Sequence, residues 1–337
     1  MAAILFDLGG THLRCALSGE DGALRKIQKT RIETFLDGHE PRVVWDKILA
    51  QMTSYVESVS GLAGSEAPVI LAFPGPIDAH KRIMGAPTVT GSNDLAIPDL
   101  RADLMSLTKR NVHILNDVSA AAWHFGQGLG MERFMVLTVS SGIGSKIFDC
   151  HHPDGVFDSK PYAGEIGHFI VDESPLAPKC DCGGIGHLGA IASGRGIERR
   201  ARFLAQAEPA DFQSSACVRD FNATPTTLTN EQHLVPGAKA GDAWAIRVIR
   251  ESTRPLARVL NCVVLGSGLD GIVLIGGFAL GLGPFYRDLV RELMMSCCDY
   301  PVLTPWLPDL IHLGDVSEEA CLEGAAAYAR RIAHGNL

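Results

Sequence analysis

The stretch that decides the fold is AAILFDLGGTHLRCAL, residues 2–17. An apolar run ends at Asp7, and the turn Gly9-Gly10-Thr11 follows before the chain becomes apolar again. This order predicts a buried strand, a glycine turn and a second strand, paired as a hairpin. Glycines let the backbone approach a phosphate closely, Thr11 offers a hydroxyl, and Asp7 can hold Mg²⁺ through water. The same residues also suit an ordinary tight hairpin, so the turn alone leaves both interpretations open.

A second segment repeats this order. Residues 134–139 are apolar, the turn after them contains Ser141, Gly142 and Gly144, and residues 146–148 resume the strand pattern. Two such hairpins, each opening one half of the chain, predict a duplicated architecture that holds one nucleotide. The second turn lacks the G-x-x-x-x-G-K-[ST] spacing of a Walker loop.

The composition is that of a soluble, well-packed protein with 46% hydrophobic and 20% charged residues. Its 337 residues exceed what one hydrophobic core usually serves, so two domains are expected. A formal net charge of −8 argues against nucleic-acid binding, which normally needs a basic face. No apolar run reaches the roughly 18 residues of a membrane helix, and none has the length of a secretory signal. We therefore expect a cytoplasmic protein without a nucleic-acid or membrane partner.

Helical spacing of apolar residues marks three long segments: residues 43–59, 243–265 and 318–332. Pro255 interrupts the second segment and is expected to kink it. The third is expected to pack through its small residues 324–327. Residues 205–235 are polar and irregular, and no element is predicted there.

Glycine turns follow two further predicted strands. Residues 69–73 lead into Pro74-Gly75-Pro76, a rigid turn whose glycine backbone can lie against a ligand. Residues 271–275 lead into Gly276-Gly277, where the absence of side chains leaves room for an adenosine. Each turn is weak evidence by itself.

A carboxylate stands at the end of another predicted strand. Residues 112–115 run directly into Asn116-Asp117, ahead of a helix that starts near Ser119. A carboxylate in this position is common in the catalytic sites of α/β proteins, and it is also typical of a helix N-cap. The polar loop over residues 85–92, which contains Thr88, could border the same cleft.

Metal-ligating side chains gather between residues 164 and 189. Glu165 and His168 form a Glu-x-x-His pair, and Cys180, Cys182 and His187 follow. Thiolates and imidazoles are the usual ligands of structural zinc. The nine cysteines are odd in number and mostly scattered, which favours reduced thiols and a metal site over a disulfide framework.

Together these motifs resemble those of the ROK sugar kinases, in particular bacterial glucokinases and N-acetylmannosamine kinases. They occur in the family's order: Asp7-Leu8-Gly9-Gly10-Thr11, Pro74-Gly75-Pro76, Asn116-Asp117, Gly164-Glu165-Ile166-Gly167-His168, Cys180-x-Cys182-Gly183 and Gly276-Gly277. The resemblance covers nearly the whole chain, and the pairing of Gly-Glu-Ile-Gly-His with Cys-x-Cys-Gly is specific to ROK proteins. It implies an α/β, two-domain, actin-like/hexokinase (ribonuclease H-like) fold with a cleft between the domains. Residues 1–115 and 316–337 would form a small α/β domain, and residues 116–315 a large α/β domain with a zinc-binding loop.

The resemblance also implies a role for each matching residue. Asp117 would be the general base that takes the proton of the attacking hydroxyl. The substrate would be held by Gly75, Thr88, Asn116, Asp117, Glu165 and His168. ATP and Mg²⁺ would be held by Asp7, Gly9, Gly10, Thr11, Ser141, Gly142, Gly144, Gly276 and Gly277. A structural Zn²⁺ would be held by His168, Cys180, Cys182 and His187. Family members are often dimers, so a homo-oligomer is expected.

Two departures from the family pattern bear on specificity. His187 stands where the family has a third zinc-binding cysteine, which leaves either a Cys₂His₂ site or a glycine-rich turn that has lost its metal. Gly189 stands where the family has a sugar-binding glutamate. Loss of that carboxylate removes a charge-assisted hydrogen bond worth roughly 1.5–3 kcal/mol.

The sequence therefore predicts an ATP-dependent kinase that phosphorylates the primary hydroxyl of a glucose-like ring. Gly189 narrows the acceptor to an amino sugar such as kanosamine, or a C7-cyclitol of the valiolone type, from secondary metabolism. An ordinary glucokinase or N-acetylmannosamine kinase is the first alternative. A non-catalytic sugar-binding regulator is the alternative of another class, although Asp117 argues against it.

Overall fold

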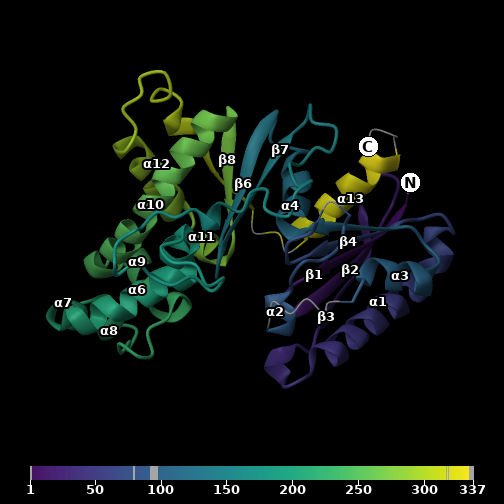
Figure 1. Cartoon of the computed structure of the whole chain (residues 1–337), viewed down its shortest axis with the longest axis horizontal. Helices are drawn as coiled ribbons and strands as arrows, with labels where there is room; N and C mark the ends of the chain where they lie inside the picture. Colours follow the sequence, from purple (N-terminus) through teal and green to yellow (C-terminus); the bar gives the residue numbers. More distant parts are fainter. Residues whose placement is uncertain (1, 79, 92–97, 316, 318, 334–337) are drawn as a thin grey trace. The chain divides into compact units, whose positions relative to one another are not determined.

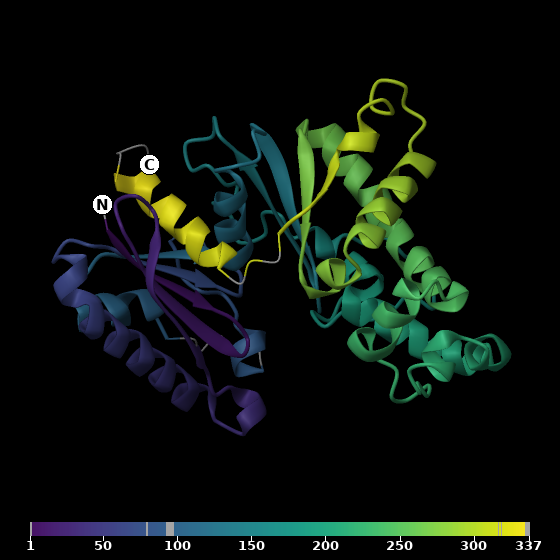
Figure 2. The same ribbon diagram turned by 180° about the vertical axis from the view of Figure 1, so that it is seen from behind.

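The computed structural model describes residues 2–78, 80–91, 98–315, 317 and 319–333, without the side chains of residues 87 and 88. Contacts divide the chain into two compact units, which appear in Figure 1 and, from behind, in Figure 2. The N-terminal unit comprises residues 1–132, 146–163 and 317–337, and the C-terminal unit comprises residues 133–145 and 164–316. No helix of the described chain is long and apolar enough to cross a membrane.

The N-terminal unit is built on a five-stranded sheet of order β3-β2-β1-β4-β5. Its strands are β1 (Ala3–Leu8), β2 (His12–Ser18), β3 (Leu24–Arg31), β4 (Val69–Phe73) and β5 (Val112–Asn116). β1 pairs antiparallel with β2 and parallel with β4, and β5 is parallel to β4. Every residue of β1 and β4 is buried, as expected of central strands covered on both faces.

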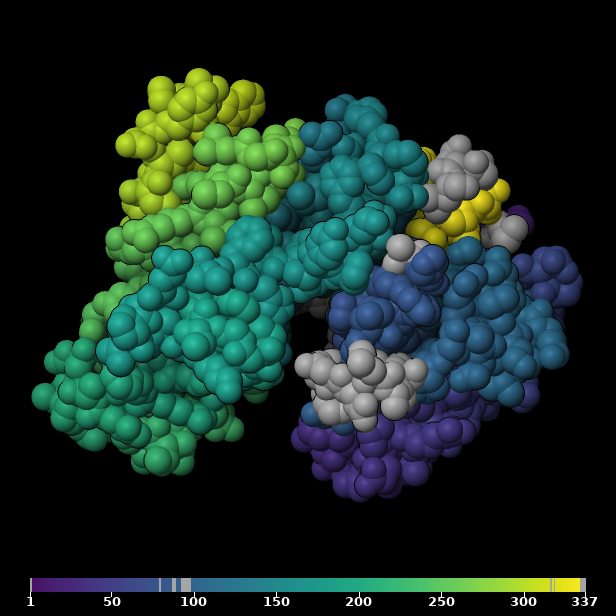
Figure 3. All heavy atoms as spheres, viewed as in Figure 1, coloured from purple at the N-terminus to yellow at the C-terminus, as the bar shows by residue number. Residues whose placement is uncertain are grey.

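Helices cover both faces of this sheet (Figure 1). α1 (Pro41–Ala63) and α3 (Leu100–Thr108) share a core with Ile4, Phe6 and Leu8. On the other face lie α4 (Asp117–Phe125) and the last helix, α13 (Ala320–Ala333), which packs against α4, β1 and β4. In the space-filling view the yellow atoms of α13 lie among atoms from the first part of the chain (Figure 3). The small residues 324–327 of α13 are all buried, as the sequence predicted.

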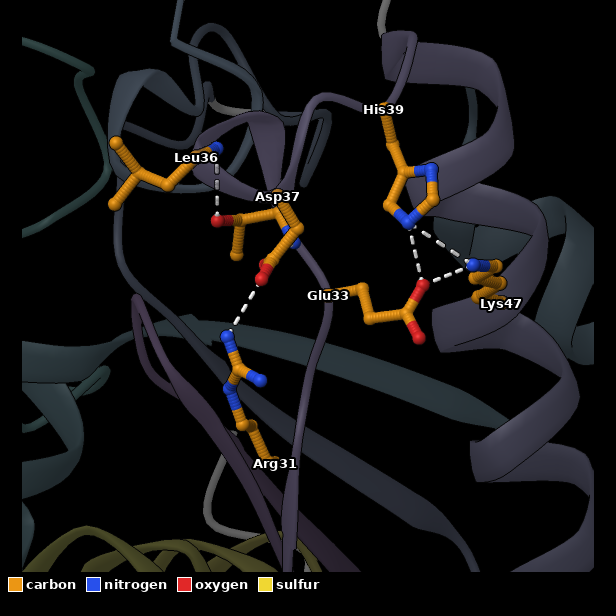
Figure 4. A network of polar contacts seen from close by, with 7 residues as sticks. Arg31, Glu33, Leu36, Asp37, His39 and Lys47 are labelled. Carbon is orange, nitrogen blue, oxygen red and sulfur yellow. Dashed lines mark hydrogen bonds and ion pairs between the residues drawn. The ribbon is translucent and has the colours of Figure 1, made fainter.

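The segment after β3 is held by polar contacts that Figure 4 shows. Glu33 contacts His39 at 2.6 Å and also Lys47 of α1. Arg31 pairs with Asp37, which belongs to a short 3₁₀ helix over Phe35–Asp37. These contacts fix the segment that links the edge of the sheet to α1.

The C-terminal unit contains a second sheet, of order β7-β6-β8-β9. Its strands are β6 (Arg133–Val139), β7 (Ile143–Asp149), β8 (Gly271–Ile275) and β9 (Ile311–Leu313), and β8 is parallel to β6 and β9. The longer helices are α6 (Gly194–Ala207), α10 (Ala243–Ser267) and α12 (Pro284–Ser296), and the shorter ones near the site are α5 (Leu188–Ala192) and α11 (Gly277–Leu282). α10 continues through Pro255. The boundary between the two units falls within β7: its residues up to Ser145 belong to the C-terminal unit, and residues 146–149 belong to the N-terminal unit.

Two features differ from the sequence-based expectations. Residues 116–132 and 146–163 group with the N-terminal unit, so the division does not follow the predicted boundary after residue 115. The reason is that α4 packs along α13, which returns to the N-terminal sheet. Residues 205–235 are not irregular: they contain α7 (Pro209–Gln213), α8 (Ala216–Arg219) and a π-helix, Asn230–Leu234, ahead of α9 (Val235–Lys239). Short polar helices of this kind carry too few apolar repeats to be recognised from spacing alone.

Candidate active site

In the N-terminal unit, Asp117 stands at the junction of β5 and α4. Asn116 caps the helix, because its Oδ1 accepts hydrogen bonds from the backbone N–H groups of Val118 (3.0 Å) and Ser119 (3.4 Å). The Asn116 amide donates to the Gly75 carbonyl oxygen at 3.0 Å. Asn116 therefore takes the capping role that the sequence left open for Asp117, whose carboxylate accepts a hydrogen bond from the Val118 N–H at 2.8 Å.

Burial raises the pKa of Asp117 from its ordinary value to about 6. The nearby negative charge of Asp7 raises this pKa further, while the Val118 N–H and the Lys146 ammonium oppose the rise. Lys146 is itself fixed by a hydrogen bond from its Nζ to the Ala163 carbonyl, at 2.5 Å. A carboxyl with a pKa near neutrality is a suitable proton acceptor, because it is ionised at pH 7 yet binds a proton readily.

The first glycine turn joins β1 to β2 as predicted, but Asp7 lies within β1 and not in the turn. Asp7 pairs in register with Arg14 on β2, whose Nη1 donates to Asp7 Oδ2 at 3.0 Å. Burial raises the pKa of Asp7, and the Arg14 guanidinium opposes that rise. The Gly9 N–H donates to the His12 carbonyl at 2.9 Å and closes the turn, which leaves Thr11 exposed at its tip.

Gly75 is held tightly, because a Cβ at this position would lie 2.2 Å from the Gly85 carbonyl oxygen. The turn after β4 therefore lies directly against the loop that precedes α2 (Pro87–Thr90). Thr88 lies in α2, and its side chain is outside the described part of the structure. The structure thus brings Gly75, Asn116 and Asp117 together, with Asp7 close to Asp117.

In the C-terminal unit, the second glycine turn connects β6 to β7. The Gly194 N–H, at the start of α6, donates to the Ser140 carbonyl of this turn at 2.7 Å. Gly276 has a φ of +95°, and a Cβ there would lie 2.6 Å from Thr138 Oγ1, so only glycine fits. A Cβ on Gly277 would lie 3.7 Å from Ser140 Oγ. The structure therefore gathers the β6–β7 turn, Gly276-Gly277 and the α6 N-terminus in one place.

Ser140 and Gly194, which the structure places beside Gly276-Gly277, were not among the residues predicted from the sequence. The available signal was Ser193-Gly194 directly before a helix, since Ser193 caps α6 through its hydroxyl at 3.1 Å from the Gly196 N–H. Its link to the turn could not be read from the sequence, because the two segments are more than fifty residues apart.

Four side chains of the C-terminal unit form a candidate metal centre. One ligand atom from each of His168, Cys180, Cys182 and His187 lies within 4.8 Å of the others. The Nδ1 atoms of His168 and His187 are 3.4 Å apart, and Cys182 Sγ lies 3.3 Å from His187 Nδ1. Ligands at about 2.0–2.3 Å from a tetrahedral ion are separated by roughly 3.3–3.8 Å, so these side chains fit a zinc-sized site.

His168 presents its two ring nitrogens to different partners. Its Nδ1 faces the metal-ligand cluster, while its Nε2 lies 3.9 Å from Glu165 Oε2. Glu165 is the N-cap of the 3₁₀ helix Ile166–His168 and His168 is its last residue, so the Glu-x-x-His pair spans a single turn. The metal cluster therefore adjoins the predicted substrate-binding pair.

A side chain at position 189 would press on the backbone of Gly167. Gly189 lies in the first turn of α5, and a Cβ there would lie 3.2 Å from the Gly167 carbonyl oxygen, between Glu165 and His168 in sequence. A contact of this length needs a shift of only a few tenths of an ångström. A side chain at position 189 therefore fits only if the Gly167 backbone moves by that amount.

Comparison with known proteins places this chain in a family. The ROK family model matches residues 3–332. A C(7)-cyclitol 7-kinase of Streptomyces hygroscopicus subsp. limoneus is 32% identical over 335 residues, which is 97% of this chain and 93% of the relative. A 2-epi-5-epi-valiolone 7-kinase of Actinoplanes sp. is 30% identical over 307 residues, 85% of this chain and 80% of the relative.

A solved structure confirms the fold class predicted from the sequence. The ROK hexokinase from Thermus thermophilus superposes with a TM-score of 0.74 at 25% identity, covering 99% of this chain and 100% of that one. The mixed α/β architecture with two sheets is thus the actin-like fold of the ROK hexokinases. The chain belongs to the ROK family, among sugar and cyclitol kinases.

Proposed function

We propose that this protein is an ATP-dependent kinase that phosphorylates the primary hydroxyl of a C7-cyclitol related to valiolone. Membership of the ROK family and the kinases among its relatives give the enzyme class. The observation that carries the acceptor is Gly189, which lacks the carboxylate that the family uses to bind the ring of a sugar. A carbocyclic acceptor has no hemiacetal for that carboxylate to bind.

Asp117 acts as the general base in this proposal. Its carboxylate accepts the proton of the acceptor hydroxyl late, as the new O–P bond forms, because an alcohol is too weakly acidic to ionise beforehand. The Asn116 side chain, fixed to Gly75 and to the first turn of α4, holds the acceptor beside Asp117. Gly75, Thr88, Glu165 and His168 complete the assigned substrate-binding set.

The glycine turns hold the nucleotide. Phosphoryl transfer depends mainly on positioning and charge neutralisation, which backbone N–H groups and Mg²⁺ supply. We assign Asp7, Gly9, Gly10 and Thr11 to the phosphates and Mg²⁺, and Ser141, Gly142, Gly144, Gly276 and Gly277 to the phosphates and adenosine. The packing of Gly277 beside Ser140 supports the second set.

We assign a structural Zn²⁺ to His168, Cys180, Cys182 and His187, whose donor types and spacing suit it. The ion would fix the loop over residues 180–187 and orient the His168 ring, leaving Nε2 for an acceptor hydroxyl. Arg195 and Arg199 of α6 both contact Asp181, at 2.5 and 3.4 Å, and anchor the same loop from outside.

The acceptor is tested with an ATP-coupled assay over valiolone-type C7-cyclitols, kanosamine, glucose and N-acetylmannosamine. We expect the C7-cyclitol to give the highest kcat/KM. Kanosamine as the best substrate would move the acceptor to the amino sugars. Glucose turning over best, with a low KM, would show an ordinary glucokinase and refute the assignment.

A Gly189→Glu variant tests the residue that carries the argument. The new carboxylate should raise kcat/KM for glucose relative to the cyclitol by roughly 10–100-fold, the equivalent of one charge-assisted hydrogen bond. Gly189→Gln is the matched control for side-chain volume. An equal change for both acceptors in the two variants would show that position 189 does not select the acceptor.

A non-catalytic sugar-binding regulator is the second class to exclude. Asp117→Asn separates the classes, because a kinase variant of this kind should still bind the acceptor while turnover is lost. The homodimer, the cytoplasmic location and a role in secondary metabolism stay predictions from the sequence. Sedimentation of the purified chain measures the first of them directly.

A further inference from the structure

A pocket of about 350 Å³ lies at the far end of the α4–α13 helix pair, within the N-terminal unit. Its lining includes Trp123, Gln127, Phe148, Cys150, Arg330 and Arg331. This α4–α13 pocket has the size of a small-molecule site, and none of the roles assigned above uses it.

The charge in the α4–α13 pocket is positive. Arg330 and Arg331 form the last turn of α13, and neither forms an ion pair with a carboxylate of the described chain. Arg330 Nη2 donates only weakly, at 3.3 Å, to Gln127 Oε1. Arg331 Nε is buried without a hydrogen-bond partner among the described residues. A buried cationic donor without a partner costs free energy that an anionic ligand would recover, since guanidinium binds phosphate in a bidentate manner.

Part of the pocket's lining is aromatic and preformed. The rings of Trp123 and Phe148 meet edge to face, with centroids 5.4 Å apart. Gly155 and Gly126 allow this, because a Cβ on Gly155 would lie 2.5 Å from the Trp123 ring and one on Gly126 would lie 2.6 Å from Phe148. The apolar face of a small ring can therefore pack against this wall while a phosphate meets the arginines.

The two helices connect the pocket to the catalytic carboxylate. α4 begins at Asp117 and ends beside the pocket, a length of about 13 Å for nine helical residues. At the other end of α13, Cys321 Sγ contacts the Asp117 carbonyl oxygen at 3.7 Å. A Cβ on Gly324 would lie 1.7 Å from the Ala120 carbonyl oxygen, so the two backbones touch and cannot shift independently. Figures 1 and 2 show α4 and α13 side by side.

We propose that the α4–α13 pocket is an effector site for a phosphate monoester of a small cyclic polyol. Binding there displaces α4 with α13 and changes the position of Asp117, so that the ligand lowers turnover without occupying the active site. The kinase's own product has this chemistry, and so has a hexose 6-phosphate from elsewhere in metabolism. The proposal that the ligand is the kinase's own product rests on the proposed function, whereas the proposal of a hexose 6-phosphate does not.

The test uses the whole chain of 337 residues, with titration calorimetry and inhibition kinetics for three probes. These are the phosphorylated cyclitol product, glucose 6-phosphate and inorganic phosphate. We expect a phosphate monoester to inhibit in a way that saturating acceptor does not relieve. The double variant Arg330→Gln/Arg331→Gln should keep kcat and KM but bind the ester at least 10-fold more weakly. The exposed pair Arg25→Gln/Arg42→Gln is the control for the same change of charge.

Inhibition that is purely competitive with the acceptor, and unchanged in the double variant, would overturn the proposal. If inorganic phosphate binds as tightly as the esters, the pocket does not recognise the polyol ring, and that part of the proposal is wrong. Whichever ester binds more tightly identifies the source of the ligand. The titration with glucose 6-phosphate needs no turnover. A chain that phosphorylates no acceptor yet binds this ester through Arg330 and Arg331 would refute the proposed function and leave the effector site standing.

Discussion

Asp117 shows how a single residue's role depends on its neighbours. Asn116 accepts hydrogen bonds from the Val118 and Ser119 N–H groups, so capping of α4 does not depend on the Asp117 carboxylate, which itself accepts from the Val118 N–H. Burial and the charge of Asp7 both raise its pKa, to about 6. The same environment that makes Asp117 a good proton acceptor makes its ionised form costly to the fold.

The first prediction concerns activity and pH. If Asp117 must be ionised to accept a proton, kcat/KM should be constant at pH 7–8 and fall as the pH drops through about 6. Asp117→Asn should lower kcat by about 10²–10⁴-fold, the usual contribution of a general base. A pH–rate profile of the wild type checks this. An acid limb that stays flat down to pH 4.5 would contradict it.

The second prediction concerns stability: the substitution Asp117→Asn, which should lower activity, should raise the free energy of unfolding at high pH. A raised pKa penalises the folded state only where the group ionises, so the penalty is absent below about pH 4 and complete above about pH 6. Without Mg²⁺, Asp117→Asn should therefore stabilise the protein at pH 8 by on the order of 1–2 kcal/mol, discounted because the side chain is partly exposed. Urea unfolding at pH 8 and pH 4 measures the difference. Equal stabilisation at both pH values would argue against this cause.

At the scale of elements, the contact between α4 and α13 is a very close approach of two helices near the site. Gly324 makes it possible, because any side chain there would collide with the α4 backbone at Ala120. Gly61, by contrast, lies in α1, and a Cβ at that position would have no other atom within 4 Å among the described residues. A change of glycine to alanine should therefore lower the free energy of unfolding at position 324 and raise it at position 61.

We predict that Gly324→Ala lowers the free energy of unfolding by about 2–3 kcal/mol, through overpacking against α4. Gly61→Ala should raise it by about 0.5–1 kcal/mol, because alanine loses less entropy in a helix. Chemical denaturation of both variants measures these changes in the free energy of unfolding. A neutral Gly324→Ala would mean that α13 can move away from α4, and it would weaken the effector proposal as well.

The loop over residues 180–187 is the second element with a direct test. Cys182→Ser should lower the bound zinc measured by mass spectrometry and raise KM for the acceptor by about 10-fold or more through the loss of His168 orientation. The change in kcat should be smaller, since the proposed ion would hold the loop and would take no part in the reaction. Cys150→Ser, an exposed thiol outside the cluster, is the control. Wild-type protein without zinc, at full activity, would refute the assigned metal.

At the scale of the whole molecule, the chain crosses between its two units several times. The last helix belongs to the N-terminal unit although it follows the C-terminal unit in sequence. Its buried residues, among them Leu322 and Tyr328, cover β1, β4 and α4. The core of the N-terminal unit is therefore complete only when α13 has packed against it.

Removal of residues 317–337 should unfold the N-terminal unit and leave the C-terminal unit folded. Hydrogen exchange measured by mass spectrometry should show lost protection in β1, β4 and α4, and retained protection in β8 and α10. Uniform loss of protection across both units would show that they fold as one.

The sequence by itself determined the features that are local in the chain. The strand–turn–strand pattern around Gly9 and Gly10, strands β4 and β8, and the sites of the long helices follow from alternation, helical spacing and glycine turns. The ligand cluster was also readable, since Cys180, Cys182 and His187 lie within eight residues of one another. Residue type and short spacing in the sequence were sufficient to predict these strands, turns, helices and the ligand cluster.

The tertiary structure alone decided what depends on distant contacts. Asp7 lies in β1 beside Asp117, Gly194 meets Ser140, and the last helix holds α4 through Gly324 and Cys321. The thiol of Cys321 and the carbonyl of Asp117 are 204 positions apart, and no local pattern encodes such a pair. The pKa of Asp117, the unit boundaries and the α4–α13 pocket all arise from contacts of this kind, because burial and close backbone approach exist only once the chain has folded.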